Sequence, residues 1–339
     1  MEFPIPFGWY AVAYSDDISA GDVLPLHYFN EHMVLFRTED GVATVMQAYC
    51  PHLGAHLGYG GKVRGNSIAC PFHAWEFNTA GECVNVPYAT SIPKQAQGKP
   101  CLYSYPVREC NRMIWAWYHP RRLAPLFELD NITELKDPNW SEFDLYEWEI
   151  NSCIQETGEN GVDIAHFVYV HNAREMPKAA ITLDGHRRDT DMVTKGPAID
   201  EAGNLDFNKL ENSHLTSKNC GPGMTTQVFS RAFKTVMLGT VTPITQNRLI
   251  LRFAFTKPLD ISDSFNILTD GMIAEIVRQV QFDIPIWENK IYRETPLLCD
   301  GDGPIAKYRK WFSQFYDDPD ADIIRSVPSA DHTITEQRK

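Results

Sequence analysis

The sequence has no apolar run long enough to cross a membrane, since no stretch reaches the roughly 18 apolar residues that a spanning helix needs. Positive charge is also scarce: 31 lysines and arginines face 44 acidic residues, and the formal net charge is −13. Such a chain has no general affinity for phosphate backbones or anionic lipid, so we expect no nucleic-acid partner. The N-terminus, MEFPIPFGWY, lacks the basic segment that opens a secretory signal. We therefore expect a cytoplasmic protein without a transmembrane segment.

Four further patterns are missing. The sequence contains no glycine-rich phosphate loop, no internal repeat and no low-complexity tract, which leaves a nucleotide-binding function without support. The eight cysteines do not form the paired framework of a disulfide scaffold. In a cytosolic chain, clustered cysteines and histidines more often bind metal. Only Cys50 and Cys70 lie in such a cluster.

The length predicts two domains, because a single hydrophobic core rarely grows beyond about 250 to 300 residues. Up to about residue 125, short β-type runs such as HMVLFRT and RMIWAWYH alternate with Gly, Asp, Asn and Pro turns. Beyond that point come a helical stretch around 155–171, β-type runs at 225–241 and 247–257, and helical text at about 264–292. We expect an α+β protein with an all-β domain over 1–125. The second domain, over 126–339, should combine an antiparallel sheet with a long late helix.

Residues 48–75, AYCPHLGAHLGYGGKVRGNSIACPFHAW, bring cysteines and histidines together in two turns. Cys50-x-His52 is followed, after seventeen residues, by Cys70-x-x-His73. Zinc fingers usually pair like with like, whereas each turn here supplies one thiolate and one imidazole. This order is typical of a Rieske [2Fe–2S] site, in which two cysteines hold one iron and two histidines hold the other. Tetrahedral zinc is the alternative.

The same segment indicates the type of Rieske protein. Respiratory-chain members carry an extra cysteine in each turn, and the matching positions here are Ala55 and Phe72. The segment therefore resembles the oxygenase and ferredoxin branch. A ferredoxin needs only about the first domain, so residues 126–339 require another function.

A second motif lies in NGVDIAHFVYVH, residues 160–171, with the pattern Asp163-x-x-His166-x₄-His171. Burying a carboxylate and two imidazoles without partners costs several kcal/mol, which a bound metal would offset. Asp163 and His166 share one face of an ideal helix, but His166 and His171 are about 140° apart around it. The helix must therefore bend, bulge or end if both histidines bind one ion. A polar patch on an amphipathic helix is the alternative.

A third ligand should be acidic, because two histidines and one carboxylate form a triad that leaves positions open for oxygen and substrate. The candidate is Asp283 in GMIAEIVRQVQFDIPIWENK, where it falls within an apolar stripe at helical spacing. Pro285 predicts a kink that turns Asp283 toward the histidines. The alternative is a buried carboxylate paired with Arg278 or Lys290.

Together these motifs resemble the catalytic α subunit of Rieske non-haem iron oxygenases. The segments DIPIWENKIYRETPLL and GPIAKYRKWFSQFY are similar to the steroid-acting branch, which includes the oxygenase component of 3-ketosteroid 9α-hydroxylase and the cholesterol 7-desaturases. The resemblance implies a Rieske domain followed by a helix-grip (Bet v1/START-like) catalytic domain, and a head-to-tail homotrimer. It also implies the ligand sets: Cys50, His52, Cys70 and His73 for the [2Fe–2S] cluster, His166, His171 and Asp283 for mononuclear Fe(II), and Asp163 as a bridge between the centres of neighbouring chains.

The function implied is O₂- and NAD(P)H-dependent hydroxylation of a steroid-like substrate, a 3-ketosteroid. Electrons would come through a separate reductase, with or without a ferredoxin, because the chain has no flavin or nicotinamide fingerprint. Lys62 and Arg64, between the two cysteine-containing turns, are candidates for a basic docking patch. Desaturation or demethylation of another bulky apolar or aromatic substrate is one alternative. An electron-transfer protein with a non-catalytic ligand-binding domain is another.

Overall fold

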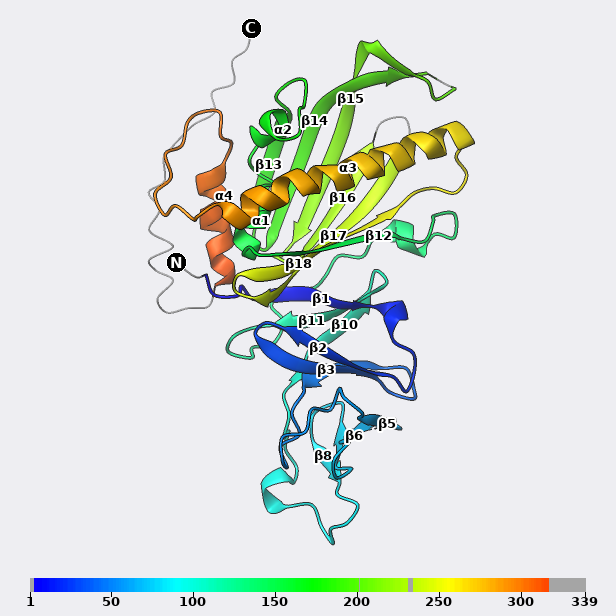
Figure 1. Cartoon of the computed structure of the whole chain (residues 1–339), viewed down its shortest axis with the longest axis vertical. Coiled ribbons are helices and arrows are strands. Elements are labelled where there is room, and N and C mark those ends of the chain that lie inside the picture. The colour runs from blue at the N-terminus through cyan, green and yellow to red at the C-terminus, as the bar shows by residue number, and fades with distance from the viewer. Residues whose placement is uncertain (1–2, 201, 231–233, 317–339) are drawn as a thin grey trace. The chain divides into compact units, whose positions relative to one another are not determined.

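The computed structural model describes residues 3–200, 202–230 and 234–316, and Figure 1 shows the order of its elements. The chain divides into two compact units. The first unit comprises Phe7–Asn131 and Thr242–Gln246, and the second comprises the other described residues. Within these residues, no helix combines the length and the apolar character needed to cross a membrane.

The first unit consists of three antiparallel sheets with two short 3₁₀ helices, as the β-type runs predicted. One sheet has the order β1-β11-β10, a second β2-β3-β4-β9, and a third β5-β6-β7-β8. The bounds are β1 Gly8–Tyr14, β2 Val23–Tyr28, β3 Glu31–Arg37, β4 Ala43–Gln47, β5 Lys62–Arg64, β6 Ser67–Ala69, β7 Glu76–Asn78, β8 Cys83–Asn85, β9 Ser104–Tyr105, β10 Val107–Cys110 and β11 Met113–Tyr118, with η1 Ser15–Asp17 and η2 Lys94–Ala96.

One apolar cluster of this unit contains both motif cysteines. Cys50 and Cys70 are buried together with Val34, Phe36 and other core residues from β3 to β8. Side chains in a close-packed core have little freedom to change conformation. The two thiols are therefore held by the core, although each belongs to a loop.

The second unit is built on a seven-stranded antiparallel sheet with the order β12-β18-β17-β16-β15-β14-β13. Strands β16, β17 and β18 coincide with the predicted β-type runs. Strands β13 to β15 were not predicted, because β14 and β15 carry Lys, Asp, Asn and Ser without a clear alternation of apolar residues, and much of β15 is exposed. The bounds are β12 Asp144–Ile150, β13 Lys178–Asp184, β14 Arg187–Ile199, β15 Leu205–Cys220, β16 Met224–Ser230, β17 Lys234–Thr245 and β18 Arg248–Thr256.

Helix α3 (Asp263–Asn289) lies across one face of this sheet (Figure 1) and confirms the predicted long late helix. The Ser262 hydroxyl accepts a hydrogen bond from the Phe265 N–H and caps its start. The helix continues through Pro285 without a break. The helical stretch expected around 155–171 is instead two short helices, α1 (Ile154–Glu159) and α2 (His166–Tyr169). The remaining helices are η3 Thr133–Lys136, α4 Ile305–Phe312 and η4 Ser313–Phe315.

Candidate metal centres and substrate cavity

Two loops with the same hydrogen-bond pattern carry the Cys/His motif. In the loop after β4, the Cys50 N–H donates to the Ala55 carbonyl at 2.9 Å, and the Gly54 N–H donates to the Cys50 carbonyl at 2.9 Å. In the loop between β6 and β7, the Cys70 N–H and the Trp75 carbonyl are 2.8 Å apart, and the Ala74 N–H and the Cys70 carbonyl are 3.0 Å apart. The fourth residue after each cysteine has positive φ, 77° at Gly54 and 55° at Ala74. The sequence thus builds the same turn twice.

These loops bring the four motif side chains together. The His52 and His73 rings have centroids 4.9 Å apart, and His52 also stacks on Trp75 at 4.7 Å. Burial raises the pKa of the Cys50 thiol to about 12, and the neighbouring Cys70 thiol contributes, while the His52 and Leu53 N–H groups act in the opposite direction. A thiolate at this position therefore needs a bound cation.

A buried ring nitrogen supports the same conclusion. The Nδ1 atom of His73 is buried without a hydrogen-bond partner among the described residues. Buried polar atoms rarely remain unpaired unless a ligand or ion takes them. The arrangement fits a metal cluster held by Cys50, His52, Cys70 and His73, and the ligand assignment stays a prediction.

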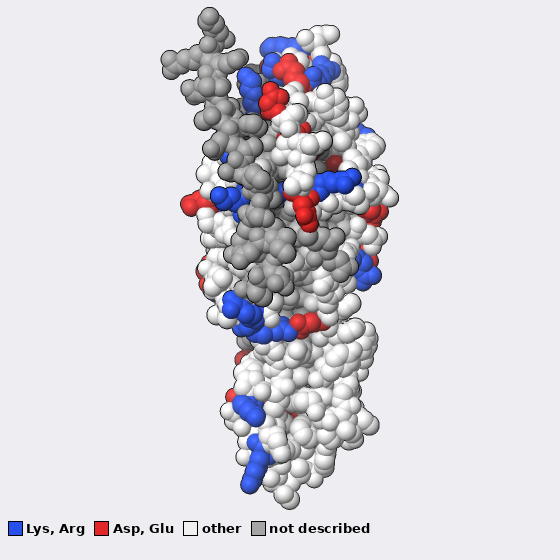
Figure 2. Space-filling view, turned by 90° about the vertical axis from the view of Figure 1, so that its left-hand side faces the viewer, with Lys and Arg blue, Asp and Glu red and all other residues white. Residues whose placement is uncertain are grey.

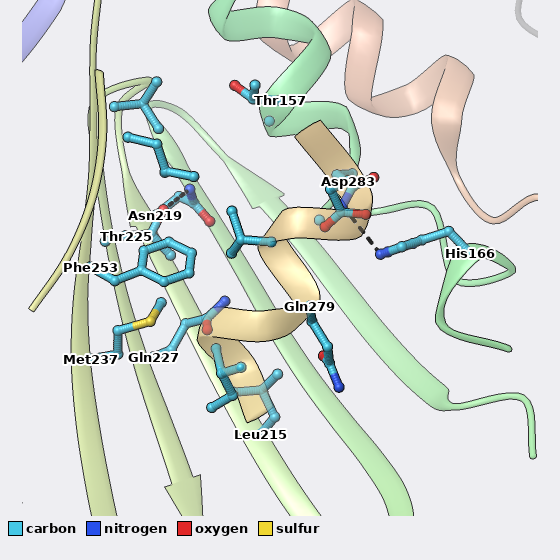
Figure 3. Close-up of a pocket in the computed structure, with 18 of the residues that line it drawn as sticks. Thr157, His166, Leu215, Asn219, Thr225, Gln227, Met237, Phe253, Gln279 and Asp283 are labelled. Carbon is cyan, nitrogen blue, oxygen red and sulfur yellow. Dashed lines mark hydrogen bonds between the residues drawn. The ribbon is translucent and has the colours of Figure 1, made fainter. Parts of the chain in front are cut away.

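The second motif converges with a carboxylate 120 residues later in the chain. His166 begins α2, His171 follows that helix, and Asp283 lies on α3. Their potential ligand atoms all lie within 4.8 Å of one another. His171 Nε2 is 3.4 Å from Asp283 Oδ2, and Figure 3 shows His166 and Asp283 pointing toward each other. The end of α2 at Tyr169 makes this possible, because a straight helix that continued to His171 would separate the two histidines around its axis.

Local hydrogen bonds set the proton position on His166. Its Nδ1 contacts the backbone carbonyl of Asp163, which can only accept, so Nδ1 carries the proton and Nε2 keeps its lone pair. Burial lowers the pKa of His166, which favours the neutral ring. A neutral imidazole whose Nε2 carries no proton is the form that binds a metal ion.

The alternative pairing of Asp283 is not observed. Arg278 pairs with Glu275 at 2.6 Å, and Lys290 pairs with Glu156. Asp283 is 7% exposed, and besides His171 its contacts include the amide of Asn160 at 3.2 Å.

Asp163 lies next to His166 in an unexpected way. Its carboxylate Oδ1 accepts from the His166 backbone N–H at 3.2 Å, whereas its main-chain carbonyl contacts the ring. The carboxylate therefore holds the start of α2, and Asp163 contacts the ring only through its backbone carbonyl. Its role as a bridge between chains stays a prediction.

Sequence reasoning missed Asn160. Its Nδ2 lies 3.2 Å from both His166 Nε2 and Asp283 Oδ2, so one amide joins two members of the triad. The sequence signal that could have found Asn160 was its spacing: it lies three residues before Asp163, and residues three apart share one side of a helical turn.

An ion pair fixes the helix that precedes this centre. The Arg309 guanidinium on α4 donates two hydrogen bonds to the Glu159 carboxylate on α1, at 2.6 and 2.9 Å, and donates a third to the Arg293 carbonyl. Glu159 and Arg309 are buried. A buried bidentate pair of this kind fixes geometry as well as position. Asn160 follows Glu159 directly, so this pair also holds the amide that contacts the triad.

A cavity of about 230 Å³ adjoins the triad. One wall is α3, and the opposite wall is the face of the sheet to which alternate residues of β15 to β18 point (Figure 3). Most of the lining is apolar, which suits a bulky apolar ligand. The apolar lining includes Leu215, Phe229, Met237, Val241, Leu251, Phe253, Ile276, Val280 and Trp287.

Comparison with known families gives two matches. Residues 116–316 match the family described as 3-Ketosteroid 9alpha-hydroxylase C-terminal domain, and residues 8–103 match the Rieske [2Fe-2S] domain. The second match favours an iron–sulfur cluster over zinc. Together the two matches confirm the predicted order of a Rieske domain followed by a catalytic domain.

Curated relatives cover most of the chain. Cholesterol 7-desaturase of Caenorhabditis elegans is 34% identical over 92% of this chain and 77% of the relative. The 3-ketosteroid-9-alpha-monooxygenase oxygenase component of Rhodococcus rhodochrous is 29% identical over 92% of this chain and 81% of the relative.

Solved structures show the same fold. Dicamba monooxygenase bound to dicamba has a TM-score of 0.70 at 18% identity, covering 93% of this chain and 98% of that one. Pseudomonas putida CBB5 NdmA with caffeine has a TM-score of 0.71 at 20% identity, covering 96% and 97%.

Proposed function

Because the chain belongs to the Rieske non-haem iron oxygenases and carries a 3-ketosteroid 9α-hydroxylase C-terminal domain, we propose that it hydroxylates a steroid-like substrate, a 3-ketosteroid, with O₂ and NAD(P)H. It is the oxygenase component of a multicomponent system. The observation that carries the proposal is the convergence of His166, His171 and Asp283 beside a largely apolar cavity.

Each proposed group has a matching set of side chains. The [2Fe–2S] cluster would be held by Cys50, His52, Cys70 and His73, and Fe(II) by His166, His171 and Asp283. When bound, the cluster supplies electrons and Fe(II) activates O₂ for attack on a C–H bond.

The protein's own residues prepare this chemistry. The Asp163 carbonyl orients the His166 ring, and the Asn160 amide lies between that ring and the Asp283 carboxylate. The aromatic and aliphatic wall excludes water and holds an apolar skeleton next to the triad.

Desaturation is the second candidate reaction. The cholesterol 7-desaturases of Caenorhabditis elegans and Ciona intestinalis are 34% and 32% identical to this chain, somewhat more than the monooxygenase relative. The same metal ligands serve both reactions, so the triad geometry does not separate them. Only the product does.

The proposed partners are a separate reductase, with or without a ferredoxin, and two further copies of this chain. Leu53 and Phe72, next to two proposed cluster ligands, are 64% and 62% exposed, and such apolar side chains suit an interface between copies. The face of the first unit at the lower end of Figure 2 carries few charged side chains. Lys62 on β5 is exposed, whereas Arg64 pairs with Glu76 at 2.8 Å, so of these two candidates Lys62 is the better basic group for reductase docking. A cytoplasmic location stays a prediction.

The proposal is tested by product analysis. The iron-loaded protein, a surrogate reductase and NADH are incubated with a panel of steroids and aromatic acids under ¹⁸O₂, and the products are identified by mass spectrometry. We expect a hydroxylated steroid that carries ¹⁸O. A steroid with a new double bond and no label would establish the second candidate. Consumption of NADH without any change in the steroids would contradict both.

A further inference from the structure

We propose that the Thr225 hydroxyl is a hydrogen-bond donor that binds a carbonyl oxygen of the substrate, and that Arg188 and Asn219 fix it in this role. The inference deepens the proposed function and rests on it, since it concerns which oxygen of a steroid-like molecule the cavity recognises. It also distinguishes ketones from alcohols, which neither the metal ligands nor the apolar wall can do.

The three residues form one row across the sheet. Arg188 on β14 pairs in register with Asn219 on β15, which pairs with Thr225 on β16. Their side chains lie on the same face, and all three line the cavity. In register with Thr225 on the next strand is Gly239, which has no side chain to cover the hydroxyl. Figure 3 shows Asn219 and Thr225 on the sheet wall, opposite α3.

Hydrogen bonds along this row can run in only one direction. A guanidinium has donors and no acceptor. The Arg188 Nε and Nη2 atoms donate to Asn219 Oδ1 at 3.1 and 2.8 Å, which fixes the oxygen of the Asn219 amide toward Arg188. The amide nitrogen must then face Thr225, and it donates to Oγ1 at 2.6 Å. The Thr225 oxygen is an acceptor in this bond, so its own hydrogen is left to donate.

That hydrogen has no acceptor among the residues that the structure describes; the only hydrogen bond of Oγ1 is the one it accepts from Asn219. The hydroxyl lies at the wall of a cavity whose lining is mostly apolar and includes Met237 and Phe253, with the amide of Gln227 on the same face of β16. A donor in such surroundings gains most from an oxygen delivered by the ligand.

The charge of Arg188 strengthens this preference. Arg188 is 5% exposed, and the described residues that its guanidinium contacts are neutral: Asn219, the Gly158 carbonyl at 2.8 Å and the Tyr308 ring at 5.5 Å. Burial lowers its pKa, with no carboxylate acting against it. The field of an unneutralised guanidinium polarises the hydrogen-bonded row, which favours a substrate group with negative partial charge at its free end. A ketone oxygen has that charge and can only accept a hydrogen bond. An alcohol therefore gains less binding free energy from this donor.

The test compares two ligands that differ only in their single oxygen, 5α-androstan-3-one and 5α-androstan-3β-ol. Binding to the iron-loaded full chain is measured by equilibrium dialysis without oxygen or reductase, so that no turnover occurs. The wild type should bind the ketone more tightly. Thr225→Val keeps the shape and removes the donor, and it should weaken ketone binding about 3- to 10-fold. Thr225→Ser should restore most of that loss.

Two further variants test the direction of the hydrogen bond and provide a control. Asn219→Asp offers only acceptors, so the Thr225 hydrogen turns toward the carboxylate and its oxygen lone pair faces the cavity. The preference should then shift toward the alcohol. Thr226→Val is the matched control, because Thr226 points to the opposite face of β16 and should bind both ligands like the wild type.

The possible results distinguish a failure of this inference from a failure of the proposed function. Steroid binding that Thr225→Val leaves unchanged, or a ketone-to-alcohol ratio that Asn219→Asp leaves unchanged, would overturn the inference and leave the proposed function standing. Failure of the wild type to bind either steroid would overturn both.

Discussion

Replacing Asp283 by alanine should remove the mononuclear iron and leave the cluster intact. The carboxylate is 7% exposed and lies 3.4 Å from His171 Nε2 and 3.2 Å from the Asn160 amide. Truncation leaves two imidazoles without the charged ligand that balances the ion. It should not unfold the chain, because losing a buried carboxylate also removes its desolvation cost.

The magnitude follows from the number of ligands. Losing only a hydrogen-bond partner of a ligand typically costs about 10- to 100-fold in metal affinity, and losing one of three ligands should cost at least as much. The iron content should therefore fall from three per chain, two in the cluster and one at the triad, to two. Iron is quantified by elemental analysis, and the visible absorbance of the cluster is recorded on the same sample.

A control comes from the same helix. Glu288 is exposed and accepts hydrogen bonds from Asn151 at 3.0 and 3.1 Å, so Glu288→Ala should keep three irons. Full iron content in Asp283→Ala would refute the assignment and move the carboxylate ligand elsewhere, with Glu288 and Asp300 as the next residues to test.

Three other changes give distinct readouts. His73→Cys should lower the reduction potential in a redox titration, because thiolate donates more charge to iron than imidazole does; an unchanged potential in a variant that keeps its cluster would exclude His73 as a ligand. Asp163→Asn retains an acceptor for the backbone of α2, so iron should be kept, while reoxidation of a pre-reduced cluster by substrate and O₂ slows by orders of magnitude in rapid mixing. Glu159→Gln leaves the buried Arg309 without its carboxylate partner and should cost about 3 to 5 kcal/mol in urea unfolding, whereas Glu149→Gln, at an exposed ion pair, should cost less than about 1 kcal/mol.

Much of the fold was predictable because its signals are local. Short β-type runs between turns indicated the first unit, and the apolar stripe around Asp283 indicated α3. Strands β14 and β15 were not predictable in this way. Many of their polar residues are exposed, Arg188 and Asn219 line the cavity, and only pairing with neighbouring strands makes these segments part of a sheet.

The candidate site likewise contains residues with a local sequence signal and residues without one. The candidate metal-binding motifs were visible because Cys and His at fixed spacing are rare without a metal, and the angle between His166 and His171 already required a bend or an end in the helix. Asn160 and Arg188 have no such signature. Their roles depend on hydrogen bonds to residues far apart in the chain, Asp283 and Asn219, and these contacts exist only after folding.

We propose that this one chain holds both the [2Fe–2S] cluster that supplies electrons and the Fe(II) centre that activates O₂. This proposal is tested most directly by a single turnover: the iron-loaded protein is reduced, freed of reductant, and mixed with a 3-ketosteroid and ¹⁸O₂ in the absence of any reductase. We expect oxidation of the cluster together with a steroid product that carries ¹⁸O, and no product from Asp283→Ala. Oxidation of the wild-type cluster with the steroid unchanged would contradict the proposal and identify the chain as an electron carrier with a ligand-binding domain.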